Sequence, residues 1–125
     1  MVNEIKTEKL KLLIENVYES DYRDLQMLME KINSPGVRIC LDTGHLLCSS
    51  KQGIELWIEN LKPYIEYVHL HWNIGKNDDH LIPPNKFLLE LKELLERNNI
   101  NPVIALEYEI NDGVKEIERV RTHFR

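Results

Sequence analysis

Four residues whose side chains can bind a metal ion each follow a short apolar run. They are Glu15 after residues 10–14, Asp42 after 37–41, His69 after 65–68 and Glu107 after 103–106. Any one of them has an ordinary explanation as a solvated strand end, a helix cap or a hydrogen-bonded structural histidine. Carboxylates gathered in one pocket, however, repel one another unless a cation compensates. The set therefore predicts a divalent metal site, and its mixed oxygen and nitrogen ligands suit Zn²⁺, Mn²⁺ or Co²⁺ better than Ca²⁺.

A second group of polar residues consists of His45, Asp78 and His80. Two imidazoles and a carboxylate can bind a second metal ion or hold the hydroxyl groups of a substrate, and the sequence leaves both roles open. Glu109, two residues beyond Glu107, is a fallback ligand. His71 is expected to be structural and to point behind the sheet, away from His69.

The apolar runs alternate with segments of helical periodicity. Strands are predicted over residues 10–16, 37–41, 65–71 and 103–106, and helices over 20–32, 53–60, 85–98 and 112–121. Residues 1–9 are charged and are expected to be a lead-in, while 43–52 and 73–84 are expected to be loops. This βαβαβαβα order predicts an α/β fold with parallel strands covered by helices. In such sheets the ligand site lies beyond the carboxyl ends of the strands, where the four metal-binding candidates fall.

Composition limits the class of protein. The 125 residues are 42% hydrophobic, which is enough for the core of one domain spanning residues 1–125. A net charge of −5 does not favour nucleic acid as a partner. Cys40 and Cys48, with no signal-like segment, indicate free thiols in the cytoplasm rather than a disulfide. No apolar run approaches the roughly 20 residues of a membrane-spanning helix.

The run Leu41-Asp42-Thr43-Gly44-His45, together with residues 13–16, 68–71, 77–81 and 104–107, resembles the xylose isomerase-like barrel superfamily. This superfamily includes sugar isomerases and epimerases and the endonuclease IV type of apurinic-site nuclease. The resemblance implies that the strands are the fifth to eighth of a (β/α)8 barrel, which makes the chain a half-barrel. It also assigns roles to the seven polar residues. Glu15, Asp42, His69 and Glu107 would hold one metal ion, and His45, Asp78 and His80 match an additional zinc site of the nucleases. In epimerases the position of His45 faces the substrate.

The activity implied by the resemblance is metal-assisted proton transfer on a small sugar or another hydroxy-carbonyl compound. Glu15 and Glu107 would be the acid and base. The alternatives are an endonuclease IV-like phosphodiester hydrolase and a truncated, non-catalytic metal-binding remnant. Trp72 and Ile74 stand where many relatives have acidic residues, so substrate recognition is expected to differ.

The resemblance covers half of a barrel, since a complete barrel of this kind usually has about 250 residues. Two open sheet edges invite pairing with another strand. The expected partner is therefore a second copy of the chain in a homodimer, or a complementary half-barrel chain.

Overall fold

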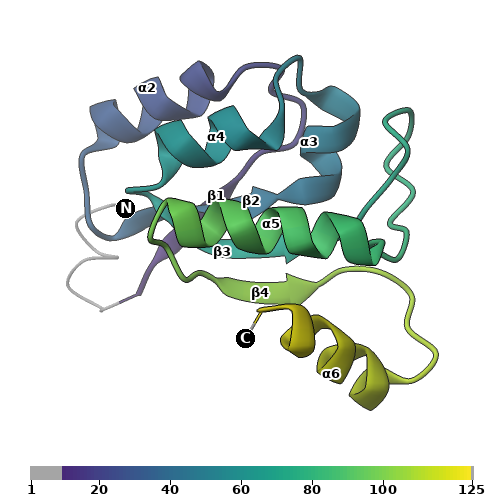
Figure 1. Ribbon diagram of the computed structural model, residues 1–125. Coiled ribbons are helices and arrows are strands. Elements are labelled where there is room, and N and C mark those ends of the chain that lie inside the picture. Colours follow the sequence, from purple (N-terminus) through teal and green to yellow (C-terminus); the bar gives the residue numbers. More distant parts are fainter. Residues whose placement is uncertain (1–9, 125) are drawn as a thin grey trace.

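The computed structural model describes residues 10–124, which form one sheet with helices packed beside it (Figure 1). The expected lead-in at residues 1–9 lies outside the described residues. The four strands are β1 (Leu12–Glu15), β2 (Val37–Asp42), β3 (Ile65–Leu70) and β4 (Val103–Leu106), in the spatial order β1-β2-β3-β4. All neighbouring strands pair in parallel. Because all four strands run in parallel, their carboxyl ends lie at the same edge of the sheet. The predicted α/β fold with parallel strands is confirmed.

Four helices match the predicted helical segments. They are α2 (Tyr22–Ile32), α4 (Ile54–Leu61), α5 (Asn85–Arg97) and α6 (Gly113–Phe124). The carboxylate of Asp21 caps α2 by accepting a hydrogen bond from the backbone N–H of Arg23 at 2.9 Å. Asn33 ends the same helix in the left-handed conformation with φ 44°, which an asparagine adopts more readily than most residues.

The prediction of a loop over residues 43–52 is wrong for most of that segment, because α3 (Thr43–Ser49) begins directly at the end of β2. Asp42, the last residue of β2, accepts a hydrogen bond from the backbone N–H of His45 at 2.8 Å and so caps the helix. Leu46, 4% exposed, packs this short helix against the core. The aspartate at the end of β2 therefore favours the start of a helix at this point.

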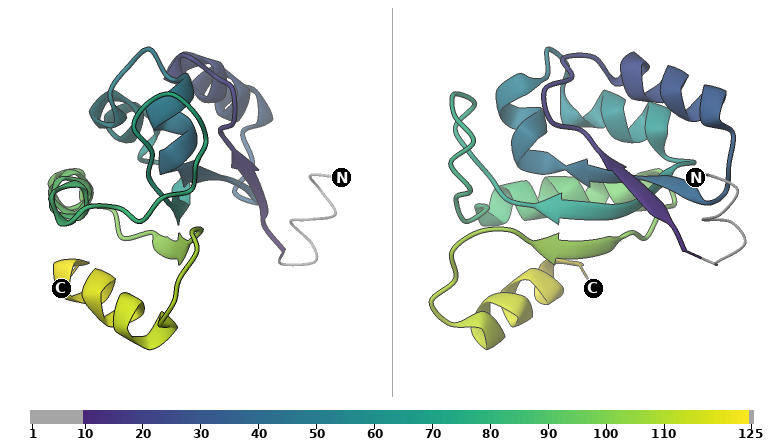
Figure 2. Two further views of the ribbon diagram at one scale, coloured as in Figure 1. Left: turned by 90° about the vertical axis from the view of Figure 1, so that its right-hand side faces the viewer. Right: turned by 180° about the vertical axis from the view of Figure 1, so that it is seen from behind.

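The core lies on one side of the sheet. Figure 2, left, shows the helices on that side and no described helix over the opposite face. Ile39, Leu41 and Val68 point toward the helices and are fully buried, and they pack with Trp57 of α4. On the opposite face, which we call the inner face, Tyr67 remains 36% exposed. Apolar burial therefore stabilises the sheet from one side.

The segment after β3 forms a loop that extends beyond the carboxyl ends of the strands, near α3 (Figure 1). Two backbone hydrogen bonds between Trp72 and Leu81, of 3.0 and 2.8 Å, close its base. Asn73 is buried, unlike most of this polar loop, and its side-chain amide donates to the carbonyl of Gly44 at 2.8 Å. These contacts hold the loop against the start of α3.

Two further expectations concern the whole chain. Cys40 and Cys48 are free thiols, and burial raises the pKa of Cys40 to about 12. Within residues 10–124, no helix combines the length and the apolar character that crossing a membrane requires.

Candidate functional site

The structure brings together the four metal-binding candidates at the carboxyl ends of the strands. Glu15 ends β1, Asp42 ends β2, His69 is the penultimate residue of β3 and Glu107 directly follows β4. Each side chain offers one ligand atom within 4.8 Å of the others. We call these four residues the inner cluster. The expectation that successive strand ends deliver them to one place is confirmed.

His69 lies at the centre of the inner cluster. Its Nδ1 is 3.2 Å from Glu107 Oε1, 3.4 Å from Glu15 Oε1 and 3.9 Å from Asp42 Oδ2. The Asp42 side chain is fully buried, whereas the other three are a quarter to a third exposed. The inner cluster is thus buried at Asp42 and accessible to a ligand at Glu15, His69 and Glu107.

The charges of the inner cluster are incompletely compensated. Burial, together with the neighbouring Asp42, raises the pKa of Glu15. Burial opposes ionisation of Asp42 as well, but hydrogen bonds from His71 and from the backbone N–H of His45 hold its pKa below the usual value. Asp42 Oδ2 is buried and accepts no hydrogen bond from residues 10–124. A buried carboxylate oxygen without a donor, beside two further carboxylates and an imidazole, fits a divalent cation.

Asn16, for which no role was predicted, supports this arrangement. Its side-chain Oδ1 accepts from the backbone N–H of Asp42 at 2.8 Å, and its Nδ2 donates to the carbonyl of Asp42 at 3.0 Å. Because Asn16 is buried and follows Glu15 directly, it fixes the ends of β1 and β2 relative to each other.

The residues predicted as a second group also converge, on Asp78. His45 Nε2 lies 3.1 Å from Asp78 Oδ2, and His80 Nε2 lies 3.3 Å from the same oxygen. His80 occupies the left-handed region with φ 50°, and the pKa of its ring is raised by a hydrogen bond with the carbonyl of Glu107 and by Asp78. For His45, burial opposes protonation, but the carbonyl of Asn16 and the nearby carboxylates raise the pKa.

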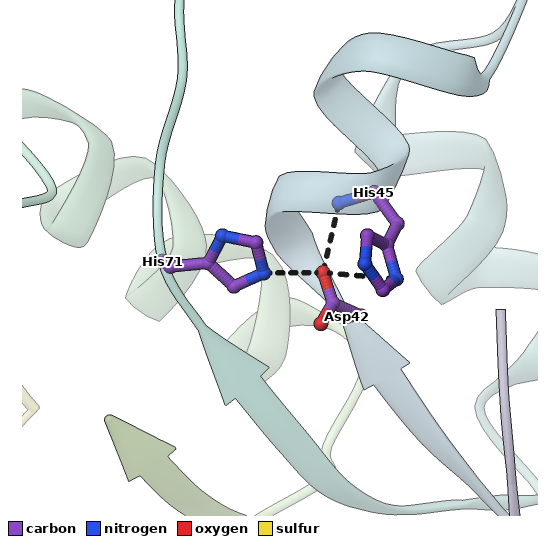
Figure 3. Close-up of side chains that lie close together, drawn as sticks. All are labelled: Asp42, His45 and His71. Atoms are coloured by element: carbon purple, nitrogen blue, oxygen red, sulfur yellow. Dashed lines mark hydrogen bonds and ion pairs between the residues drawn. The ribbon is translucent and has the colours of Figure 1, made fainter. Parts of the chain in front are cut away.

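His71 joins this second group, which corrects the expectation that it points behind the sheet. It lies just past the end of β3, and residues two apart in a strand face the same side, so His71 turns toward the site as His69 does. Its Nε2 is 2.7 Å from Asp42 Oδ1 (Figure 3), and its Nδ1 is 3.7 Å from Asp78 Oδ1. We call His45, His71, Asp78 and His80 the outer cluster.

Other candidates lie apart from both clusters. Glu109, the fallback ligand, is exposed and belongs to none of the ligand groups found among residues 10–124. Trp72 is half-buried and Ile74 is 63% exposed.

Comparisons with known proteins agree with this architecture. The chain matches the family model of the xylose isomerase-like TIM barrel over residues 1–124. Among solved structures it is similar to a 3-keto-D-glucoside 4-epimerase from E. coli in the apo form, with a TM-score of 0.70 and 12% sequence identity. That alignment covers 97% of this chain and 49% of the epimerase chain, so the chain spans about half the length of this neighbour. The curated proteins contain no match.

At this low identity the solved structure establishes the fold alone, namely parallel strands that correspond to about half of a TIM barrel. The family match, by contrast, extends over nearly the entire sequence. The chain belongs to the xylose isomerase-like TIM barrel family.

Proposed function

We propose that the protein is a metal-dependent isomerase or epimerase that transfers a proton on a small sugar or another hydroxy-carbonyl compound. The observation that carries this proposal is the inner cluster, in which three carboxylates and an imidazole lie within 4.8 Å at the carboxyl ends of parallel strands. The buried, unpaired Oδ2 of Asp42 adds a position that a cation would satisfy. Membership of a family that contains sugar isomerases and epimerases agrees with it.

Glu15, Asp42, His69 and Glu107 are the residues that would hold the ion. A divalent ion such as Zn²⁺, Mn²⁺ or Co²⁺, when bound, would polarise the oxygens of a hydroxy-carbonyl compound and acidify the adjacent C–H. The experiment below compares these ions to determine which one supports activity.

Glu15 and Glu107 are the proposed acid and base. They come from β1 and from the end of β4, the two opposite edges of the sheet, and both approach His69 Nδ1 within 3.4 Å. Each is about a third exposed, so each can reach a substrate. The raised pKa of Glu15 brings this carboxyl closer to the range in which proton transfer near neutral pH is efficient. One carboxylate would remove the proton and the other would return it.

In this proposal His45, Asp78 and His80 orient the hydroxyl groups of the substrate or hold a second metal ion. His45 Nδ1 lies 3.5 Å from Glu15 Oε1 of the inner cluster, and Asp78 and His80 are about 40% exposed. They therefore surround the space that a substrate extending from the inner cluster would occupy.

We further propose that residues 1–125 act as one half-barrel unit that pairs with a second copy or with a complementary half-barrel chain. β1 and β4 are the edges of the described sheet, and Val103 on the inner face is 54% exposed. The free thiols of Cys40 and Cys48 fit the reducing cytoplasm.

The competing activity is phosphodiester hydrolysis, in which clustered metal ions activate water. The net charge of −5 provides no attractive field for a polyanionic substrate, so we rank it second. A non-catalytic metal-binding protein is the third possibility.

Deuterium exchange tests the proposal directly. The protein is reconstituted with Mn²⁺, Co²⁺ or Zn²⁺ and incubated in D₂O with a panel of aldoses, ketoses and 3-keto glycosides. NMR should show loss of a C–H signal beside a carbonyl. Glu107→Gln should abolish the exchange, and Glu109→Gln is the matched control because Glu109 lies two residues further on, outside the inner cluster.

The other outcomes separate the alternatives. Bound metal without exchange on any sugar supports the non-catalytic possibility, and cleavage of an abasic oligonucleotide without exchange supports the hydrolase. A protein that takes up no divalent ion removes both enzymatic proposals.

A further inference from the structure

Few apolar contacts hold helix α6 in place. Val120 is the one buried residue of this helix, and Ile117 is 44% exposed. A hollow of about 900 Å³ lies between α5, β4 and α6, with Leu95 and Ile104 among its lining residues. Because apolar burial at α6 is small, the position of this helix must depend on polar contacts as well.

The polar contacts of α6 converge on Arg119. Its guanidinium meets the Glu116 carboxylate at two points, with Nε 3.0 Å from Oε2 and Nη2 2.6 Å from Oε1. Nη2 also donates to the carbonyl of Pro83 at 3.1 Å, and Nη1 donates to Asn85 Oδ1 at 2.5 Å. A planar guanidinium is suited to such simultaneous contacts. Arg119 therefore ties α6 to the end of the loop that follows β3 and to the start of α5.

Glu116 extends this connection to strand β4. The hydroxyl of Tyr108, which directly follows Glu107, donates to Glu116 Oε1 at 2.7 Å. The hydrogen bonds from Arg119 and Tyr108 hold the pKa of Glu116 below its usual value, so the carboxylate is ionised beside the guanidinium. The side chains of Glu116 and Arg119 are 15% and 27% exposed, which limits the screening of this pair by water. We call Tyr108, Glu116 and Arg119 the clamp.

The clamp closes a ring of contacts around two groups of the candidate site. His80 Nδ1 lies 2.7 Å from the carbonyl of Glu107, and because a carbonyl only accepts, the ring nitrogen donates. From His80 the chain leads directly to Pro83, which Arg119 holds, and Tyr108 leads back to Glu107. Figure 1 shows the loop after β3 and the connection from β4 to α6 on the same side of the molecule, beyond the strand ends.

We propose that Arg119 is a positioning residue, which acts through the clamp to hold Glu107 and the loop that carries His80 in the arrangement seen at the inner cluster. Its guanidinium bonds to residues that are not proposed ligands, so it acts only through others. A reacting carboxylate must stay within about 0.5 Å of its productive position. The importance of Glu107 rests on the proposed function, whereas the mechanical role of the clamp does not.

The competing interpretation is an ordinary ion pair that adds stability to the whole domain. The two interpretations differ in what happens when the clamp is broken. A general stabiliser would raise the rate of opening in every part of the sheet by the same factor. A positioning device would release the loop and the end of β4 first, because α6 has few other contacts, and would leave the centre of the sheet closed.

Amide hydrogen exchange of the metal-free, full-length chain separates these interpretations. The backbone N–H groups of Trp72 and Leu81 close the base of the loop, and that of Glu107 donates to the carbonyl of Leu70 at 3.0 Å. These three amides report on the segments that the clamp joins. The amides of β2, which lies between β1 and β3, report on the centre of the sheet.

Two variants break the clamp without a large change of charge or volume. Arg119→Lys retains the positive charge, but one ammonium cannot reach Glu116, Asn85 and Pro83 together. Tyr108→Phe keeps the ring and removes only the hydroxyl, so it serves as a milder variant. Arg121→Lys makes the same exchange two residues further along α6, outside the clamp, and is the matched control.

In Arg119→Lys the exchange of Trp72, Leu81 and Glu107 should accelerate about tenfold relative to the amides of β2. Tyr108→Phe should change the same amides in the same direction by a smaller factor, and Arg121→Lys should match the wild type. Equal acceleration in β2 and in the loop, or no acceleration in either variant of the clamp, would overturn the inference.

The rate of deuterium exchange on a sugar provides the functional measurement. Arg119→Lys should lower kcat about tenfold or more with little change in KM, because a displaced Glu107 impairs proton transfer. Equal kcat values in Arg119→Lys and the wild type would overturn the positioning role. A wild type that exchanges no sugar would count against the proposed function, and the amide exchange would still decide whether the clamp positions the loop and Glu107.

Discussion

The two faces of the sheet differ in how much they are buried. On the helix-covered face Ile39, Leu41 and Val68 are completely buried, whereas Tyr67 and Val103 on the inner face are 36% and 54% exposed. The described helices cover one face of this sheet, so nearly all of the apolar stabilisation comes from that side. The inner face and the carboxyl ends are left for ligands and for pairing. Stability and function should therefore respond to different substitutions.

The helix-covered face should give the largest effect on stability. Trp57 is fully buried, and its Nε1 donates to Ser50 Oγ at 2.7 Å. Trp57→Ala should lower the free energy of unfolding by about 3–5 kcal/mol, because it leaves a large cavity and removes the hydrogen bond to Ser50. Urea denaturation followed by circular dichroism measures this change. The folded variant should keep its metal content. Loss of metal from the folded variant would show that metal binding depends on the helix-covered face.

The inner cluster should show the reverse behaviour. Glu107→Gln should weaken metal binding about tenfold or more, which corresponds to about 1.4 kcal/mol. It should hardly change the stability of the metal-free chain, because the side chain is about a third exposed. Calorimetric titration with Mn²⁺ measures the affinity, with Glu109→Gln as the control. Equal affinities in the two variants would remove Glu107 from the site.

A substitution in the edge strand β4 tests whether the inner face associates with another chain. Val103→Lys should weaken self-association, because a charge on β4 opposes burial against another chain. The stability of the monomer should change by less than about 0.5 kcal/mol. Val114→Lys, at a position of α6 that is 70% exposed, is the control. Sedimentation of the wild type at micromolar concentrations measures the assembly, and a stable monomer would reject the homodimer.

The smallest expected effect concerns the chemical reactivity of the two thiols. The Cys40 thiol should resist ionisation and alkylation, because burial raises its pKa to about 12 and disfavours the charged form. Cys48 is half-buried and lies near the end of α3. Iodoacetamide should therefore label Cys48 first in the native protein, as mass spectrometry can show. Equal labelling of both thiols would mean that the buried Cys40 side chain becomes accessible readily in the native protein.

The strand ends could be predicted from the sequence because apolar runs of four or five residues mark the buried parallel strands. Glu15, Asp42, His69 and Glu107 follow those runs directly, so the topology alone brings them to one edge. The resemblance of these segments to a known family added the prediction of a half-barrel. The match of residues 1–124 to the family model confirms the predicted family.

Two features were missed for identifiable reasons. The helix α3 has only seven residues, too few for a clear periodicity, and its start depends on the cap from Asp42. His71 was placed on the wrong side of the sheet, although the two-residue spacing from His69 indicates the same side. Its burial against Gly44 and its contact with Asp42 are long-range and have no local signal.

The metal content of the wild type and of two Asp42 variants tests the central claim most directly. Asp42→Asn retains an oxygen that can cap α3, whereas Asp42→Ala removes the cap as well. After reconstitution with Zn²⁺ and dialysis, elemental analysis should find bound metal in the wild type. Both variants should lose the ion of the inner cluster. Unchanged metal stoichiometry in folded Asp42→Asn and Asp42→Ala would contradict the account.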